Sequence, residues 1–176
     1  MVFSVEQYTK ELEAQLKELL VQESQIKAVT YQLKSSSLVL TMGNGGSAST
    51  AQHLAQGLCN AGVRAICLTD NTSLLTALSN DEGYSEALAW QVKLFSNELN
   101  IACILISASG DSPNILEAAK VANTEQMRTI GLIGFGGGKL RLLVDYPIVF
   151  SSKDYGVVED IHLTVCHLLC RLVRNG

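Results

Sequence analysis

Two loops of this 176-residue sequence combine small residues with hydroxyl side chains, a composition suited to holding an anion. The first runs from Gly43 to Thr50 and reads GNGGSAST, and the second runs from Ser107 to Ser112 and reads SASGDS. Each loop follows a short apolar run and precedes a helical pattern. Backbone N–H groups and the positive end of a helix dipole attract anions there, and serine hydroxyls donate further hydrogen bonds to phosphate oxygens.

Neither loop has the spacing G-x-x-x-x-G-K-S/T or G-x-G-x-x-G, so the sequence predicts no nucleotide cofactor and favours a small sugar phosphate as ligand. Serine-rich loops also form ordinary turns and helix caps, which makes one such loop a weak signal. Two of them after successive central strands strengthen the prediction. A third cluster, Gly134 with Gly136, Gly137 and Gly138, has no hydroxyl neighbours and is interpreted as a flexible connection.

The elements that must position these loops alternate between two periodicities. Apolar residues recur every three to four positions from Val5 to Leu33, which predicts one long helix capped by Ser4, or two helices broken near Glu23. Short apolar runs predict five strands, at 38–42, 65–68, 102–106, 129–133 and 147–150. Strands alternating with helices predict an open parallel sheet with ligands at its carboxyl edge, where the strand order reverses.

Composition limits the classes of partner. The 13 Lys and Arg residues against 17 Asp and Glu give a net charge of −4, without a basic run, so nucleic-acid binding is not expected. The apolar stretches, such as Ile101 to Ile106, are far shorter than the roughly 20 residues that span a membrane. We therefore expect a single cytoplasmic domain over residues 1–176 that binds no membrane.

The remaining side chains with distinctive chemistry are interpreted as structural. The five cysteines are odd in number and form no C-x-x-C pair, which predicts reduced thiols, and Cys166 with Cys170 alone would be a poor metal site. The stretch from Tyr84 to Phe95, with Trp90, is interpreted as core packing.

A set of motifs, taken in order along the chain, resembles the phosphoheptose isomerases of the sugar isomerase (SIS) domain family. The motifs are Gly43-Asn44-Gly45-Gly46-Ser47, Ala51-Gln52-His53, Ser79-Asn80-Asp81, Ser107-x-Ser109-Gly110-x-Ser112, and Glu159-Asp160-Ile161-His162 followed by His167. The resemblance covers nearly the whole chain. It implies a three-layer α/β sandwich with a five-stranded parallel sheet in flavodoxin-like order. It also implies a homotetramer whose active sites form at subunit contacts, with residues 1–35 as a helical segment used in oligomer packing.

The resemblance further implies roles for individual residues. The family converts sedoheptulose 7-phosphate to glycero-manno-heptose 7-phosphate. Its phosphate-binding serines match Ser47, Ser107, Ser109 and Ser112, next to Asn44 and Gly45 of the first motif, and its aspartate at the sugar matches Asp81. Family histidines matching His53 and His167 bind zinc together with a glutamate and a glutamine.

This chain departs from the family at two of those positions. Gly57 stands four residues after His53, where the family has its glutamate, and Glu159 stands where the family has its glutamine. Aldose–ketose isomerisation needs a base at the carbon beside the carbonyl and an acid or metal at the oxygens. Glu159 and His167 are the candidates for these roles, and the related phosphohexuloisomerases also place a glutamate near the start of the final helix. Together with His53, they would also make a zinc or iron set.

Spacing limits how Glu159 and His167 can meet. If both are helical, eight residues separate them by about 12 Å along the helix axis. Either Glu159 lies before the helix, or the two groups come from different subunits. Simpler interpretations remain open: Glu159 and Asp160 favour a helix N-terminus by charge alone, and His53 is then a structural histidine. His162, one turn from Glu159, is interpreted as structural.

A second function is compatible with the same residues. A SIS-domain protein that has lost catalysis would act as a sugar-phosphate-binding regulator or scaffold, similar to the bacterial protein that associates with the replication initiator DnaA. That relative also lacks the glutamate at the position of Gly57. It keeps the glutamine at the position of Glu159, however, so the gained carboxylate favours an isomerase.

Overall fold

The computed structural model describes residues 4–175, and their strands form one parallel sheet. Its strands are β1 (Leu38–Gly43), β2 (Ala65–Cys67), β3 (Ile101–Ser107), β4 (Arg128–Ile133) and β5 (Tyr146–Val149). They lie in the order β2-β1-β3-β4-β5. The five strands and the flavodoxin-like order are therefore confirmed. The order reverses between β1 and β3, so this fold binds ligands beyond the carboxyl ends of those two strands.

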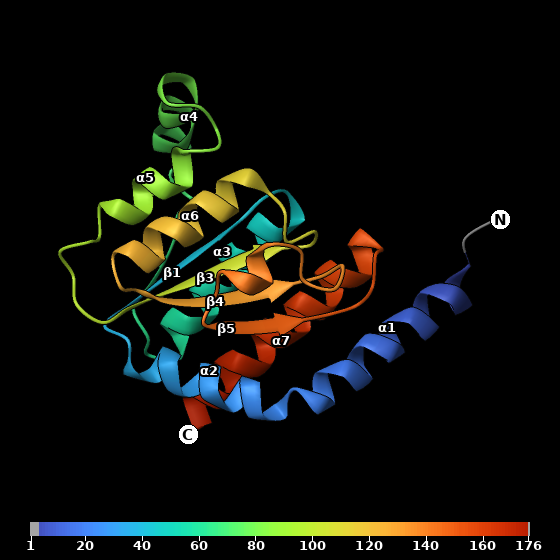
Figure 1. Ribbon diagram of the computed structural model, residues 1–176. Helices are drawn as coiled ribbons and strands as arrows, with labels where there is room; N and C mark the ends of the chain where they lie inside the picture. Colours follow the sequence, from blue (N-terminus) through green and yellow to red (C-terminus); the bar gives the residue numbers. More distant parts are fainter. Residues whose placement is uncertain (1–3, 176) are drawn as a thin grey trace.

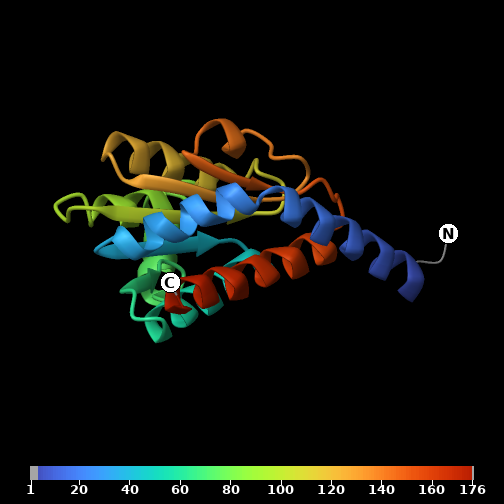
Figure 2. The same cartoon turned by 90° about the horizontal axis from the view of Figure 1, so that it is seen from below.

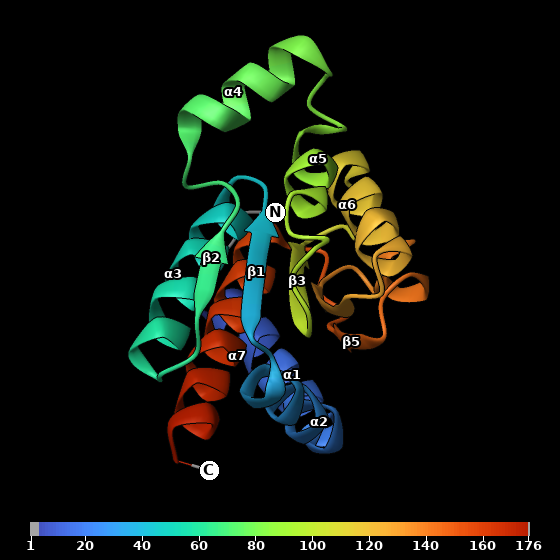
Figure 3. The same cartoon turned by 90° about the vertical axis from the view of Figure 1, so that its left-hand side faces the viewer.

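Helices cover both faces of the sheet, which gives three layers (Figure 1). The helices are α1 (Val5–Val21), α2 (Glu23–Ser35), α3 (Gly46–Asn60), α4 (Thr72–Asp81), α5 (Ala87–Lys93), α6 (Pro113–Thr124) and α7 (Tyr155–Asn175), with a 3-10 turn, η1, at Leu140–Leu142. Helices α2, α3 and α7 pack on one face, and α5 and α6 on the other. Helix α4 stands away from the sheet, above the ends of β1 and β2 (Figure 3).

Continuously apolar strands account for this layering. All positions of β1 and β3 are buried, because each of these strands has helices on both faces. Alternate residues of β3 enter different cores: Ile104 packs with α2, α3 and α7, whereas Cys103 and Leu105 pack with α5 and α6. The sheet thus forms a rigid base for the loops at its carboxyl edge.

The N-terminal segment is broken into two helices at Gln22, as the second of the two sequence interpretations expects. Ser4 caps α1 in a capping box with Gln7, which confirms the predicted start. Residues 1–3 of the expected 1–35 segment lie outside the described residues. Figures 1 and 2 show that α1 runs beside the first turns of α7.

The third glycine cluster is not the flexible connection that the sequence predicts. A Cβ atom on Gly110 would lie 2.3 Å from the carbonyl oxygen of Gly137, and one on Gly138 would lie 2.5 Å from that of Ser109. Residues 135–138 all have positive φ, which glycine tolerates best. The cluster is therefore a tightly packed turn that supports the second serine loop, and its glycines are needed for close backbone approach.

Side chains of the Tyr84–Phe95 stretch divide between core and surface, so the prediction of core packing is only partly right. Leu88 and Val92 are buried, whereas Tyr84 and Trp90 are about half exposed, at 49% and 42%. The five cysteines are free thiols, as expected. Within residues 4–175, no helix combines the length with the apolarity needed to cross a bilayer.

Candidate active site

The two serine loops meet at the carboxyl ends of β1 and β3. Gly43 pairs with Ile106 in the parallel register, so both loops leave the sheet side by side. Together with α7 they enclose a cavity of about 100 Å³, which we call the serine pocket. Its lining residues are Asn44, Ser47, Ile106, Ser107, Ala108, Ser109, Ser112, Tyr155 and Glu159. Five of the seven predicted phosphate-binding and substrate-binding residues thus line one cavity.

Internal hydrogen bonds hold the second serine loop in shape. The Ser107 hydroxyl accepts from the backbone N–H of Gly110 at 3.1 Å, and the Ser109 hydroxyl accepts from that of Asp111 at 3.2 Å. The Asp111 carboxylate in turn accepts from the N–H of Lys139, at the end of the glycine cluster. Ser112 precedes Pro113 at the start of α6. The loop therefore presents its hydroxyls at a helix N-terminus, as the sequence predicts.

A reciprocal amide pair ties the two serine loops together. Asn44 and Asn114 each donate to the other's side-chain oxygen at 2.8 Å, and Asn114 is 2% exposed. The Tyr84 hydroxyl donates to the same Asn44 oxygen at 2.7 Å. Sequence reasoning missed Asn114 and Tyr84. Asn114 directly follows the second loop, which was the available signal, whereas Tyr84 belongs to a distant segment with no motif.

Glu159 reaches the serine pocket from the second turn of α7. The helix begins at Tyr155, so Glu159 lies inside the helix, and of the two alternatives the one in which Glu159 precedes the helix is wrong. Its position beyond the first turn also weakens the interpretation as a helix-dipole charge, because that effect decays within one turn. A Cβ atom on Gly46 would lie 2.2 Å from a carboxylate oxygen of Glu159. The carboxylate therefore lies directly over the start of α3, and Gly46 provides its space.

The two candidate histidines meet elsewhere, on the outer side of α3 and α7. The rings of His53 and His167 lie edge to face, with centroids 4.8 Å apart. They open into a second cavity of about 210 Å³, which we call the histidine cleft. Its lining residues are His53, Gln56, Gly57, Asn60, His167, Cys170, Arg171 and Arg174. The cleft contains two imidazoles and two guanidinium groups, but no carboxylate.

Cys170 fills the space beside Gly57. A Cβ atom on Gly57 would lie 2.7 Å from the Cys170 sulfur, closer than such atoms approach in folded proteins. Burial raises the pKa of the Cys170 thiol, while the positive charge of Arg174 lowers it. Any longer side chain at position 57 would have to displace the thiol.

The structure does not unite the remaining predicted residues in one chain. Glu159 lines the serine pocket and His53 and His167 line the histidine cleft, and these two cavities share no lining residue. Asp81 ends α4, is exposed, and accepts a hydrogen bond from Asn80 at 2.8 Å. Among the described residues, no three His, Cys, Asp or Glu side chains are arranged to hold a metal ion.

His162 is structural, as the sequence analysis proposes. It is fully buried and packs against Phe150, with ring centroids 5.9 Å apart. Burial lowers the pKa of His162 to about 4, and the nearby Ile133 backbone opposes this shift only in part. The residue is therefore neutral at pH 7 and helps to fix α7 against the sheet.

Comparison with known proteins agrees with this fold and these motifs. A family model of the SIS domain matches residues 4–134. The chain belongs to the SIS domain family.

More particular relatives carry one name. Phosphoheptose isomerase from Helicobacter pylori strain P12 is 39% identical over 172 residues, which cover 94% of this chain and 88% of that protein. Phosphoheptose isomerase from Campylobacter jejuni is 39% identical over 150 residues, or 82% of this chain and 80% of the relative. The solved phosphoheptose isomerase of Neisseria gonorrhoeae superimposes with a TM-score of 0.88 at 26% identity, covering 96% and 95% of the two chains.

Proposed function

We propose that this protein is a sugar-phosphate aldose–ketose isomerase of the phosphoheptose isomerase type. The observation that carries the proposal is the carboxylate of Glu159 inside the serine pocket, over the start of α3. The pocket therefore offers hydroxyls and two helix N-termini for a phosphate beside a group able to accept a proton. The relatives named above support sedoheptulose 7-phosphate as the substrate and glycero-manno-heptose 7-phosphate as the product.

In the proposed reaction, the serine loops bind the phosphate and hold the sugar in place. Glu159 removes a proton from the carbon beside the carbonyl, and the His167 imidazolium gives a proton to the carbonyl oxygen. Glu159 then returns the proton to the former carbonyl carbon of the enediol. At the same time, the hydroxyl on the adjacent carbon gives its proton to His167. Asp81 would contact the sugar hydroxyls. No nucleotide takes part, because the reaction moves only protons within one substrate.

The size of the serine pocket favours a site completed by a second copy of the chain. A cavity of about 100 Å³ has room for a phosphate group, whereas sites for whole small molecules measure about 300–1,000 Å³. Glu159 and His167 also lie about 12 Å apart along α7, which is too far for both to act on one sugar carbonyl from the same helix. His167, and Asp81 if it binds the sugar, would therefore come from a neighbouring copy.

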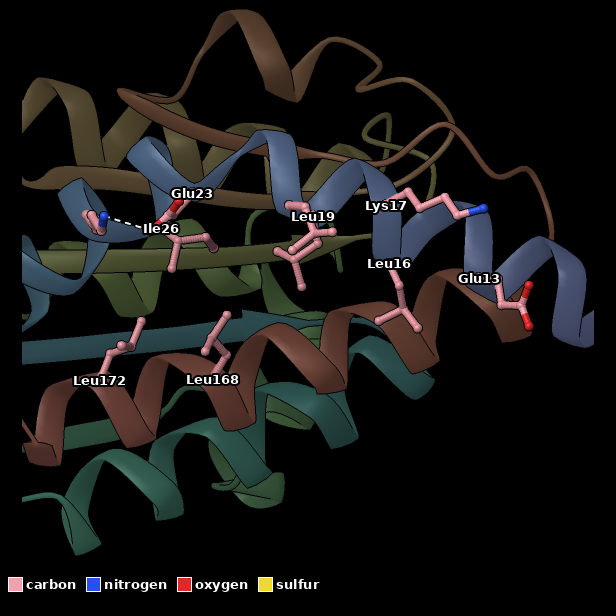
Figure 4. A pocket seen from close by; sticks show the side chains of 10 residues that line it. Glu13, Leu16, Lys17, Leu19, Glu23, Ile26, Leu168 and Leu172 are labelled. Carbon is pink, nitrogen blue, oxygen red and sulfur yellow. Dashed lines mark ion pairs between the residues drawn. The ribbon is translucent and has the colours of Figure 1, made fainter.

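An apolar groove supplies a surface for that association. Figure 4 shows Leu16 and Leu19 of α1 pointing across the groove toward Leu168 and Leu172 of α7. The groove measures about 600 Å³, and Leu20 beside it is 75% exposed. Covering this apolar surface with another chain would remove it from water.

The charges at the rim of this groove fit a second copy of the same chain. Acidic Glu13 and Glu23 alternate along the rim with basic Lys17 and Lys27. A surface that carries both signs in alternation can pair with its own copy across a two-fold axis. We therefore propose a homo-oligomer, with the tetramer that the family resemblance implies, acting in the cytoplasm where charged sugar phosphates are retained.

Zinc is compatible with the histidine cleft only in such an assembly. His53 and His167 supply two nitrogen donors of the type that zinc prefers. The third donor would be Glu159 of a neighbouring copy. Bound zinc would then replace the proton donated by His167, because a metal-bound imidazole is neutral, and would stabilise negative charge on the oxygens of the enediol. Zinc titration followed by calorimetry tests this directly: His53→Ala should remove the binding, and unchanged binding would exclude the cleft.

Proton exchange tests the proposed function. Incubation with sedoheptulose 7-phosphate in D₂O, with and without zinc, should place deuterium at the carbon beside the carbonyl, observed by NMR. A panel of other ketose phosphates would define the substrate. Sugars that bind and raise the melting temperature without any exchange would overturn the isomerase and favour a sugar-phosphate-binding regulator.

A further inference from the structure

The face of α1 that turns toward the body of the protein carries a row of polar side chains beside the apolar Leu12 and Leu19, which pack against the core. Five polar side chains follow one another at steps of three and four residues, which places them on one side of the helix: Tyr8, Glu11, Gln15, Glu18 and Gln22. We call this set the polar face of α1. Gln15, at 2% exposed, is the most buried residue of the helix. Leu12 and Leu19 supply the apolar stripe that an amphipathic helix buries, so the polar side chains beside them serve a separate contact.

The C-terminal half of the polar face pairs with the backbone that follows β5. The Gln22 amide donates to the carbonyl of Val149 at 2.9 Å and accepts from the N–H of Val149 at 3.0 Å. One Glu18 oxygen accepts from the N–H of Ser151 at 2.9 Å, and the other accepts from the Ser151 hydroxyl. The side chains of α1 thus replace a neighbouring strand for this edge of the sheet.

The middle of the polar face continues the same pairing one residue further along. Gln15 accepts from the N–H of Ser152 at 3.1 Å, and Glu11 accepts from the Ser152 hydroxyl at 2.5 Å. The Ser152 hydroxyl also accepts from the N–H of Asp154 at 3.2 Å. Three of the six residues 149–154, which we call the connector, are therefore bound by side chains of α1.

The connector ends where α7 begins, and the polar face of α1 contacts α7 as well. Asp154 accepts from the N–H of Val157 at 3.0 Å and so caps α7. The Tyr8 hydroxyl donates to Asp160 at 2.5 Å, directly beside Glu159. The first two turns of α7, which carry Tyr155 and Glu159 into the serine pocket, are thus fixed by α1 on both sides of the cap.

We propose that the polar face of α1 positions Glu159 and Tyr155 over the serine pocket, and that Glu18 is its principal positioning residue. The inference rests on the proposed isomerase function, in which Glu159 is the base. Glu18 holds two donors of one connector residue at once, and its neighbours Gln15 and Gln22 hold the residues on either side. None of these side chains lines the serine pocket, so they act on the reaction only through the connector.

Three variants of α1 separate positioning from general stability. Glu18→Ala removes both acceptors of Ser151, whereas Glu18→Gln keeps an oxygen for the Ser151 N–H. Glu6→Gln is the control on the same helix, because Glu6 is exposed and pairs only with Lys10. For Glu18→Ala we expect kcat to fall roughly tenfold to a hundredfold and KM to rise only several-fold, because misplacing a base by about 1 Å costs more in rate than in binding. Glu18→Gln should restore most of the rate, and Glu6→Gln should equal the wild type.

Binding measurements keep this inference separate from the proposed function. In calorimetry, Glu18→Ala should weaken the binding of sedoheptulose 7-phosphate several-fold relative to the binding of inorganic phosphate, because only the sugar extends toward Tyr155 and Glu159. Absence of turnover in the wild type would exclude the proposed isomerase function. The ratio of the affinities for sedoheptulose 7-phosphate and inorganic phosphate would still test the positioning role. A lower melting temperature with an unchanged kcat and an unchanged affinity ratio would overturn the inference and leave the polar face structural.

Discussion

The serine pocket and the histidine cleft lie along the same two helices, α3 and α7, but they differ in completeness. The serine pocket is enclosed by three elements, and its loops are held by hydrogen bonds and by a packed glycine turn. The histidine cleft is formed by exposed side chains of two helices, and it holds imidazole and guanidinium groups without a carboxylate. The serine pocket resembles a complete anion-binding site, whereas the histidine cleft resembles a site that lacks some of its groups.

The difference follows from what builds each region. The reversal of strand order between β1 and β3 creates the serine pocket within a single chain. The histidine cleft is built from side chains that project from the outside of the sandwich, where in the proposed assembly a neighbouring copy supplies the missing group. Phosphate binding should therefore tolerate dissociation of the oligomer better than catalysis does.

The largest expected effect comes from removing the carboxylate of Glu159 from the serine pocket. Glu159→Gln should lower kcat about 1,000-fold, within the range usual for losing a general base, because the amide cannot accept the proton. Calorimetry should find the affinity for sedoheptulose 7-phosphate nearly unchanged. Glu82→Gln, an exposed glutamate at the end of α4, is the control. Full activity in Glu159→Gln would exclude Glu159 as the base.

The serine pocket itself is tested by removing two of its hydroxyls. Ser47→Ala combined with Ser109→Ala should raise the Kd for sedoheptulose 7-phosphate about 100-fold, because two hydrogen bonds to a charged group are lost. Ser49→Ala is the matched control, since Ser49 is exposed and lies outside the pocket lining. An unchanged affinity in the double variant would sink the assignment of the phosphate site.

The histidine cleft can be given the carboxylate that it lacks. Gly57→Glu alone should lower the melting temperature, because its Cβ atom would crowd the Cys170 sulfur. Gly57→Glu combined with Cys170→Ala should fit and should tighten zinc binding about tenfold, measured by calorimetry, because a carboxylate joins the two histidines. If the double variant binds zinc no better than the wild type, the carboxylate does not point into the cleft.

The last effect, on stability rather than on catalysis or binding, concerns the segment of α7 between the two regions. Because burial holds the pKa of His162 at about 4, below its ordinary 6.5, the unfolded chain binds a proton that the folded chain does not. The stability contributed by neutral His162 is fully present above pH 6.5 and is lost as the pH falls toward 4, by about 3 kcal/mol.

His162→Leu should therefore flatten the fall in unfolding free energy between pH 6.5 and 5, followed by urea denaturation. His53→Gln, which replaces an exposed histidine, is the comparison variant. Equal pH dependence in the wild type and in His162→Leu would contradict the assignment.

The sequence predicts the serine pocket well because its determinants are local. A glycine-rich turn after an apolar run places hydroxyls at a helix start, and the alternation of strands and helices puts two such turns together. Ser47 and Ser109 line one cavity for these reasons. The packed glycine turn at 136–138 was misjudged because close backbone approach between distant loops leaves no pattern beyond the glycines themselves.

Features that depend on tertiary contacts were beyond the sequence. The bond from Tyr84 to Asn44 joins segments 40 residues apart, and the polar face of α1 contacts residues more than 125 positions away. The regular spacing of the polar side chains from Tyr8 to Gln22 is visible in the sequence. A search for amphipathic helices follows the apolar residues, however, and assigns the polar ones to solvent. The proposed meeting of Glu159 and His167 requires association between copies, which no pattern in one chain specifies.

Co-expression of two inactive variants tests most directly whether the half-sites of two copies combine. Glu159→Gln and His167→Ala should each be nearly inactive alone. In mixed oligomers, verified by native mass spectrometry, Glu159 of one copy and His167 of another are both intact at about a quarter of the sites by random assembly. The account predicts that about this fraction of the wild-type exchange rate returns. Mixed oligomers with no more activity than the separate variants would contradict it, because the two residues would then act within one chain.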